Sequence, residues 1–207
     1  MKRARAQRAL AVLAAILGAG ACALFGGSGP DYEASRGPCD ALPGGELERV
    51  AEARALIEDG LPAEARGVLL EVAERRPENV PLAILLQEVE LALAGPEGAP
   101  TVAAEAALRS AAHPTLVTRL LAARLEPDPA RAREQIEAAL AIDPRSAWAH
   151  YAIAHLEARS GNWVGAERWL ERALERDPGL LPARRLEAWP ATASARRPSA
   201  PCSIGSR

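Results

Sequence analysis

The chain has 207 residues, with 25 basic and 27 acidic side chains and an aromatic content of 3%. Charge is segregated along it: residues 1–8 hold four bases and no acid, residues 46–183 hold 23 acids and 15 bases, and residues 184–207 hold five Arg and one Glu. This acidic central body argues against a nucleic-acid interface, which needs clustered Lys and Arg. No Cys or His spacing typical of a zinc site occurs, so neither a metal nor another cofactor is predicted.

Residues 1–25 have the three parts of an export signal: a basic start, an apolar middle and small residues ending at Cys22. Three outcomes stay open. Ala19–Cys22 resembles a bacterial lipobox with Cys22 as the lipidated residue, although the usual Leu three residues before the Cys is missing. The same small residues fit a plain secretory cleavage site after Ala21. Residues 9–25 also reach the lower length limit of a retained membrane anchor.

Residues 26–45 are rich in Gly and Pro and predict a flexible linker between the membrane element and the folded part. Cys39 lies in this linker. In an oxidising compartment it would pair with Cys202 or with a second chain, or it stays a free thiol. Residues 190–207 lack apolar periodicity and predict a disordered tail.

Residues 46–189 show a helical pattern with a period. Asp143-Pro144 and Asp177-Pro178 close two similar segments that are 34 residues apart. In the last of these segments, two helical patterns meet at a turn over residues 161–163, and Pro178 closes the second pattern. The body divides into units 46–79, 80–112, 113–146 and 147–180, followed by a capping helix over 182–189.

Two further features support this division. Pro81 and Pro114 fall at the second position of their units, and Pro182 falls at the second position after the fourth unit ends at residue 180. Pro is tolerated at a helix start but not inside a helix. Asp128 is predicted to cap the second helix of its unit, with Pro129 at the first helical position. In the second unit, residues 95–100 predict a lengthened turn between the two helices.

The period and residue pattern resemble the tetratricopeptide repeat (TPR) superfamily over residues 46–189. The resemblance implies an all-α fold: a right-handed α-solenoid of about four helix-turn-helix repeats plus a C-terminal capping helix. It also implies that the first helix of each repeat lines a concave groove that binds a segment of a partner protein. The positions predicted to face this groove hold Val50, Arg54, Ile84, Glu88, Val117, Leu121, Arg124, Trp148, Tyr151 and His155.

Two interpretations of these ten residues stay open. Trp148 and Tyr151 are the expected anchors of a binding site, because aromatic residues dominate interaction hot spots. The alternative is that the curvature of the solenoid and its last helix bury part of the stripe as ordinary core. Chaperone-binding TPR domains hold a carboxylate with a Lys and Asn clamp, and that clamp is absent here, so their function is not carried over.

No phosphate-binding loop, nucleophile elbow or paired catalytic carboxylates occur, and no small-molecule substrate is predicted. We therefore expect a non-enzymatic adaptor: a membrane-tethered TPR domain outside the bacterial cytoplasm that binds another protein in envelope complex assembly. An alternative location is a soluble, secreted or periplasmic form. The alternative function is a TPR subunit of an enzyme or maturation complex, such as cytochrome c biogenesis, and an enzyme with an unrecognised site is a third hypothesis.

Overall fold

The structure is a computed structural model that describes residues 41–194, and their side chains up to residue 188. The described part of the chain is built from eight α-helices without a strand, which confirms the expected all-α class. The helices are α2 (Gly44–Glu58), α3 (Pro62–Arg75), α4 (Val80–Ala112), α5 (Leu116–Leu125), α6 (Pro129–Ile142), α7 (Ala147–Arg159), α8 (Trp163–Arg176) and α9 (Leu181–Ser194). The predicted export signal with Cys22, most of the linker, and Cys202 lie outside the described residues.

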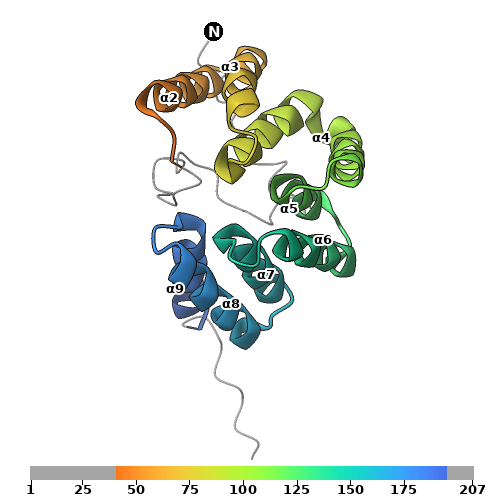
Figure 1. Cartoon of the computed structure of the whole chain (residues 1–207), viewed down its shortest axis with the longest axis vertical. Coiled ribbons are helices and arrows are strands. Elements are labelled where there is room, and N and C mark those ends of the chain that lie inside the picture. Colours follow the sequence, from red (N-terminus) through yellow and green to blue (C-terminus); the bar gives the residue numbers. More distant parts are fainter. Residues whose placement is uncertain (1–40, 195–207) are drawn as a thin grey trace, which may run out of the picture.

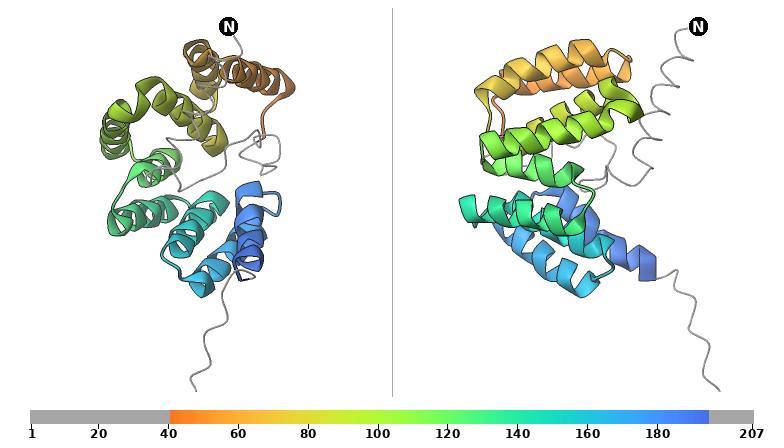
Figure 2. Two further views of the ribbon diagram at one scale, coloured as in Figure 1. Left: turned by 180° about the vertical axis from the view of Figure 1, so that it is seen from behind. Right: turned by 90° about the vertical axis from the view of Figure 1, so that its right-hand side faces the viewer.

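The helices follow one another in an arc that runs from α2 to α9 (Figure 1). Each helix packs mainly on its neighbours in the chain, and α7 also packs on α9. Helices α2, α5, α7 and α9 and the first half of α4 lie toward the inside of the arc, and α3, α6 and α8 lie outside (Figures 1 and 2). This two-layered succession of helix pairs is the expected TPR-like α-solenoid. We call the side of the inner helices that faces the centre of the arc the inner face.

Alanines bring the paired helices together. In the pair α7 and α8, Ala154, Ala166 and Ala173 are at most 1% exposed. Ala53 of α2 and Ala65 of α3 are both fully buried in the first pair. A methyl side chain lets two helix backbones approach closely, and larger apolar residues then fill the space beside the contact.

The turns of the first and fourth pairs have the same geometry because a glycine occupies the same place. Gly60 has φ 76° and Gly161 has φ 81°, the left-handed region that favours glycine. The backbone N–H groups of Leu61 and Asn162, each directly after the glycine, donate to carbonyls of the preceding helix at 2.8 and 2.9 Å. These bonds satisfy helix-end carbonyls and turn the chain back on itself.

The second pair differs from the sequence expectation. In place of a lengthened turn over 95–100, only Gly95 is non-helical inside α4, with φ 67° and ψ −175°. Pro96 follows directly and starts the second arm of α4, where its missing N–H costs no hydrogen bond. The result is a kink between two helical arms.

Side chains fix the starts of several helices. Asp128 accepts a hydrogen bond from the backbone N–H of Ala130 at 2.9 Å, so the predicted cap of α6 is confirmed. Asn79, Ser146 and Asn162 accept in the same way at the starts of α4, α7 and α8. At the other end of the solenoid, α9 continues to Ser194, beyond the predicted 182–189.

The apolar core is divided along the arc. One cluster includes Val50, Leu69 and Val89 from α2, α3 and the first arm of α4. A second includes Leu120, Ile136 and Ile153 and extends from the start of α4 to α9. A small third cluster joins the two arms of α4 to α5. The two large clusters therefore meet on the first arm of α4, which contributes Leu82 and Val89 to the first and Val80 and Ile84 to the second.

Candidate partner-binding face

The inner helices carry all ten of the residues predicted to face a partner. Two lie on α2, two on the first arm of α4, three on α5 and three on α7. Spacings of three or four residues along each helix keep these positions on one side of it. What these side chains offer a partner depends on how deeply each is buried.

The six apolar and aromatic members are buried and form part of the core. Their exposed fractions are between 1% and 9%, for Val50, Ile84, Val117, Leu121, Trp148 and Tyr151. Val50 belongs to the N-terminal cluster and the other five to the large C-terminal cluster. This burial contradicts the expectation that the stripe is an open apolar surface. The alternative, that solenoid curvature turns these positions into core, matches the structure.

Two of the four polar members, Glu88 and Arg124, form a network with Gln87 between α4 and α5. Arg124 is 1% exposed, and it donates from Nη1 to Oε1 of Gln87 at 2.9 Å and from Nη2 to Oε1 of Glu88 at 2.8 Å. Gln87 donates in turn to the backbone carbonyl of Leu121 at 3.2 Å. A buried guanidinium needs such compensation, since leaving it unpaired away from water is costly. This network therefore adds buried polar contacts to the apolar packing between α4 and α5.

Aromatic contacts continue along α7 from this network. The ring of Tyr151 lies edge-on to Trp148, with centroids 6.1 Å apart, and 6.1 Å from the ring of His155. Burial raises the pKa of Tyr151, and Arg124 and Arg185 oppose this shift. Burial and the nearby charge of Arg159 lower the pKa of His155 to about 4. His155 is therefore a neutral imidazole at physiological pH.

We expect His155 to make the protein less stable as the pH falls from about 6.5 to about 4. The unfolded chain binds a proton on this imidazole near pH 6.5, whereas the folded protein excludes it down to about pH 4, so acid favours the unfolded state. Chemical denaturation near neutral pH and near pH 4.5 checks this, with His155→Gln as the non-titrating control. The variant should lose about 2 kcal/mol less than the wild type over this interval, and an equal loss would refute the prediction.

The pKa of Glu88 shifts in the opposite direction to that of His155. Burial raises the pKa of its carboxyl, and Arg124 and Arg54 act against that shift. Its folded-state pKa above the ordinary value contributes stability at low pH that is lost as the pH rises. Because Glu88 is present in both the wild type and His155→Gln, its contribution cancels in their difference, which therefore reports on the imidazole.

Sequence reasoning missed three polar side chains of this face. Gln87 is 3% exposed and bonds to Arg124, yet its position is one residue away from the predicted stripe. The signal in the sequence was an amide side chain directly after the apolar run of residues 80–86. Arg159 and Arg185 were also missed, because they lie at the end of α7 and on the final helix, beyond the positions read from the repeats.

A further aromatic contact lies between α7 and α8. Trp169 of α8 packs against His150 of α7 with ring centroids 5.6 Å apart, and Arg172 lies 4.6 Å from the Trp169 ring centre. The contact with His150 is packing between the paired helices α7 and α8. Within residues 41–194, His, Cys, Asp and Glu form no group that would hold a metal ion.

The sequence of the C-terminal helices matches a known repeat family. Residues 120–189 match the tetratricopeptide repeat family model. The match covers α6, α7 and α8 with most of α5 and α9, and it supports placing the repeats in the TPR superfamily. TPR repeats generally mediate protein–protein interactions, and TPR domains are typically non-enzymatic. No curated protein matches the chain.

Proposed function

We propose that the protein is a non-enzymatic adaptor whose TPR solenoid binds a segment of another envelope protein along its inner face and helps to assemble an envelope complex. The observation that carries this proposal is the row of inner helices, which presents Arg54, Glu88 and His155 half-buried between buried aromatic and apolar residues. A half-buried polar row above a rigid core is a surface that can be desolvated by a partner without reorganising the fold.

Site-specific photo-crosslinking tests whether a partner binds on the inner face. A photoreactive amino acid is placed at Arg54 or His155 on the inner side, and at Leu108 or Val164 as controls. The controls are 71% and 63% exposed and lie on the second arm of α4 and on α8. We expect a discrete adduct with one envelope protein from the inner positions only. Equal adducts from all four positions would contradict a binding site on the inner face.

The membrane tether is a second part of the proposal, and it rests on the export signal in the sequence. Within residues 41–194, none of the helices combines the length and apolar character that a membrane crossing requires. We propose that Cys22 is lipidated and holds the solenoid at the membrane surface. Radiolabelled palmitate should follow the wild-type protein and be lost in Cys22→Ser. If the wild type stays unlabelled in growing cells, the lipoprotein form is excluded.

A further inference from the structure

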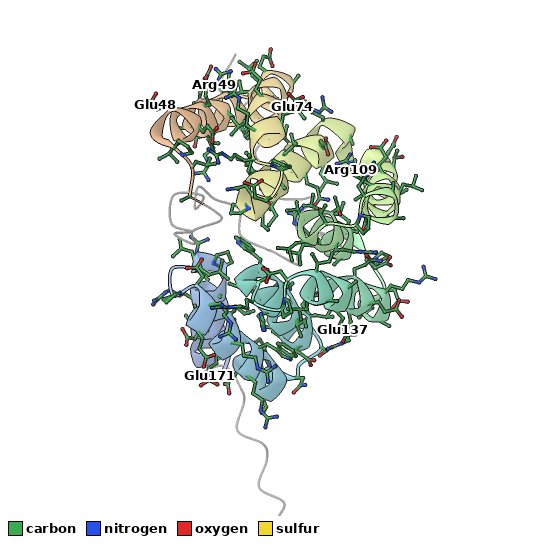
Figure 3. All side chains as sticks on the ribbon, in the orientation of Figure 1. Glu48, Arg49, Glu74, Arg109, Glu137 and Glu171 are labelled. Atoms are coloured by element: carbon green, nitrogen blue, oxygen red, sulfur yellow. The ribbon has the colours of Figure 1, made fainter. Side chains whose placement is uncertain are left out.

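The second arm of α4, residues 96–112, exposes an apolar surface on the outside of the arc. Leu108 is 71% exposed, more than any other large hydrophobic residue in the described part of the chain. Ala104, Ala107 and Ala111 are exposed around it. Figure 3 shows this arm, which carries Arg109, at the outer edge of the arc. A contiguous exposed apolar patch is typical of a surface that contacts another molecule.

The other outer helices expose more charge. Every exposed residue of α8 except Val164 is charged. Glu74 of α3 and Glu137 of α6 are also exposed, on the outside of the arc (Figure 3). The second arm of α4 therefore carries less charge on its exposed side than these three helices do.

The exposed residues of the arm follow the spacing of a helix–helix contact. Thr101, Ala104, Leu108 and Ala111 are separated by three, four and three positions, so they lie along one side of the arm. Ala106 lies on the opposite side and is buried in the third apolar cluster. The alanines let a second helix approach the exposed side closely, and Leu108 between them supplies apolar contact.

The charges beside this surface indicate what covers it. Glu105 and Arg109 are exposed and lie about one turn apart along the same edge of the surface. If a second copy of the arm lies antiparallel, with a two-fold axis near Ala107, Glu105 of each copy is opposite Arg109 of the other. Both pairs form together because a two-fold axis brings the same edges of the two helices side by side. Leu108 of one copy then lies beside Leu108 of the other, close to the axis.

From this self-complementary pattern we propose that two copies of the protein associate through the second arm of α4 as an antiparallel pair. The occupant is a second copy because the charges match when the surface meets itself. Glu97, the remaining charged residue of the arm, lies near its start and outside the overlap. The contact uses the outside of the arc, so the dimer keeps the inner faces of both copies available to partners.

Sedimentation equilibrium of the full-length protein in density-matched detergent tests the proposal. A contact of about three helical turns is smaller than the roughly 800 Å² that each partner contributes to a standard interface. We therefore expect a weak dimer, with a dissociation constant on the order of 100 μM, measured from about 10 μM to about 1 mM protein. A reducing agent excludes dimers that are linked through the native cysteines.

Leu108→Lys should weaken the association at least roughly tenfold, because it brings two positive charges together near the axis and removes the apolar contact. The matched control is Val164→Lys on α8, where the residue is 63% exposed. It should leave the dissociation constant within about twofold of the wild type. Equal weakening by both variants would reduce the effect to added charge and overturn the proposal.

Exchange of the flanking charges tests the antiparallel arrangement. Glu105→Arg or Arg109→Glu alone places like charges opposite one another at both edges and should weaken the association roughly tenfold. The double variant restores opposite charges and should return the dissociation constant to within about threefold of the wild type. A double variant as weak as either single variant would overturn the antiparallel pair, and so would a wild type that is monomeric at every concentration.

Photo-crosslinking at Leu108 identifies the molecule that covers the surface. The photoreactive residue there should link two copies of the chain, and the same residue at Val164 should not. An adduct of a different protein at Leu108 would assign the surface to that protein and overturn the dimer. The adaptor proposal is tested at other positions, on the inner face, so it stands or fails separately.

Discussion

Arg124→Ala is expected to lower the free energy of unfolding by about 3 kcal/mol. Arg124 is 1% exposed and links α5 to Gln87 and Glu88 of α4 at 2.9 and 2.8 Å. Truncation leaves a cavity and deprives a buried amide and a carboxylate of their donor. The effect lies at the lower end for a broken buried pair because the Glu88 side chain is 35% exposed and regains water. Urea denaturation followed by circular dichroism measures the change.

Arg131→Ala is the matched control, since the side chain of Arg131 is 71% exposed and lies 3.8 Å from Asp128 within the first turn of α6. Its loss should stay below about 0.5 kcal/mol. Glu88→Gln gives a second check, because it keeps an acceptor oxygen for Arg124 and removes only the charge. A loss from Arg124→Ala no greater than that of the control would show that the network does not hold α4 to α5.

Ile153→Ala is expected to cost about 3 to 4 kcal/mol, the range for removing a large aliphatic side chain from a tightly packed core. Ile153 is 1% exposed in the large C-terminal cluster, between paired helices held close by alanines. Because those helices cannot collapse onto the space left behind, the cavity should persist. Thermal and urea unfolding would measure the loss.

Val164→Ala on the neighbouring α8 is the control for Ile153→Ala, since Val164 is 63% exposed. It removes aliphatic carbon from the same helix pair without opening a cavity, and a change below about 0.5 kcal/mol is expected. Similar losses from both variants would mean that the C-terminal core is far looser than its burial indicates.

The repeat architecture could be predicted from the sequence because it depends on local, periodic features. Gly161 requires a left-handed turn, Asp128 and Pro129 start a helix, and alanines recur where helices touch. Each of these acts within a few residues, so the spacing of about 34 positions translates directly into helix pairs. The kink at Gly95 could not be predicted in this way. The Gly and Pro residues that follow Gly95 are typical of a loop, although Pro96 is compatible with a helix start.

Which side chains of the candidate site are buried and which are exposed could not be predicted in the same way. Whether Trp148 and Tyr151 are exposed depends on how strongly successive pairs rotate, and that rotation arises from packing between repeats. Arg124 reads as a surface charge in the sequence, yet it is buried because Gln87 and Glu88 of another repeat lie within hydrogen-bond distance.

Because the helices pack mainly on their neighbours in the chain, the arc can bend through small changes at each contact between helices. Small rotations at successive contacts add up along the arc, so the distance between α2 and α9 can change while every core cluster stays intact. The contact between α4 and α5 combines three polar side chains with apolar packing in the large C-terminal cluster and in the third cluster. A segment that binds on the inner face would set the curvature of the arc, and a pull on either end would change how tightly that segment is held.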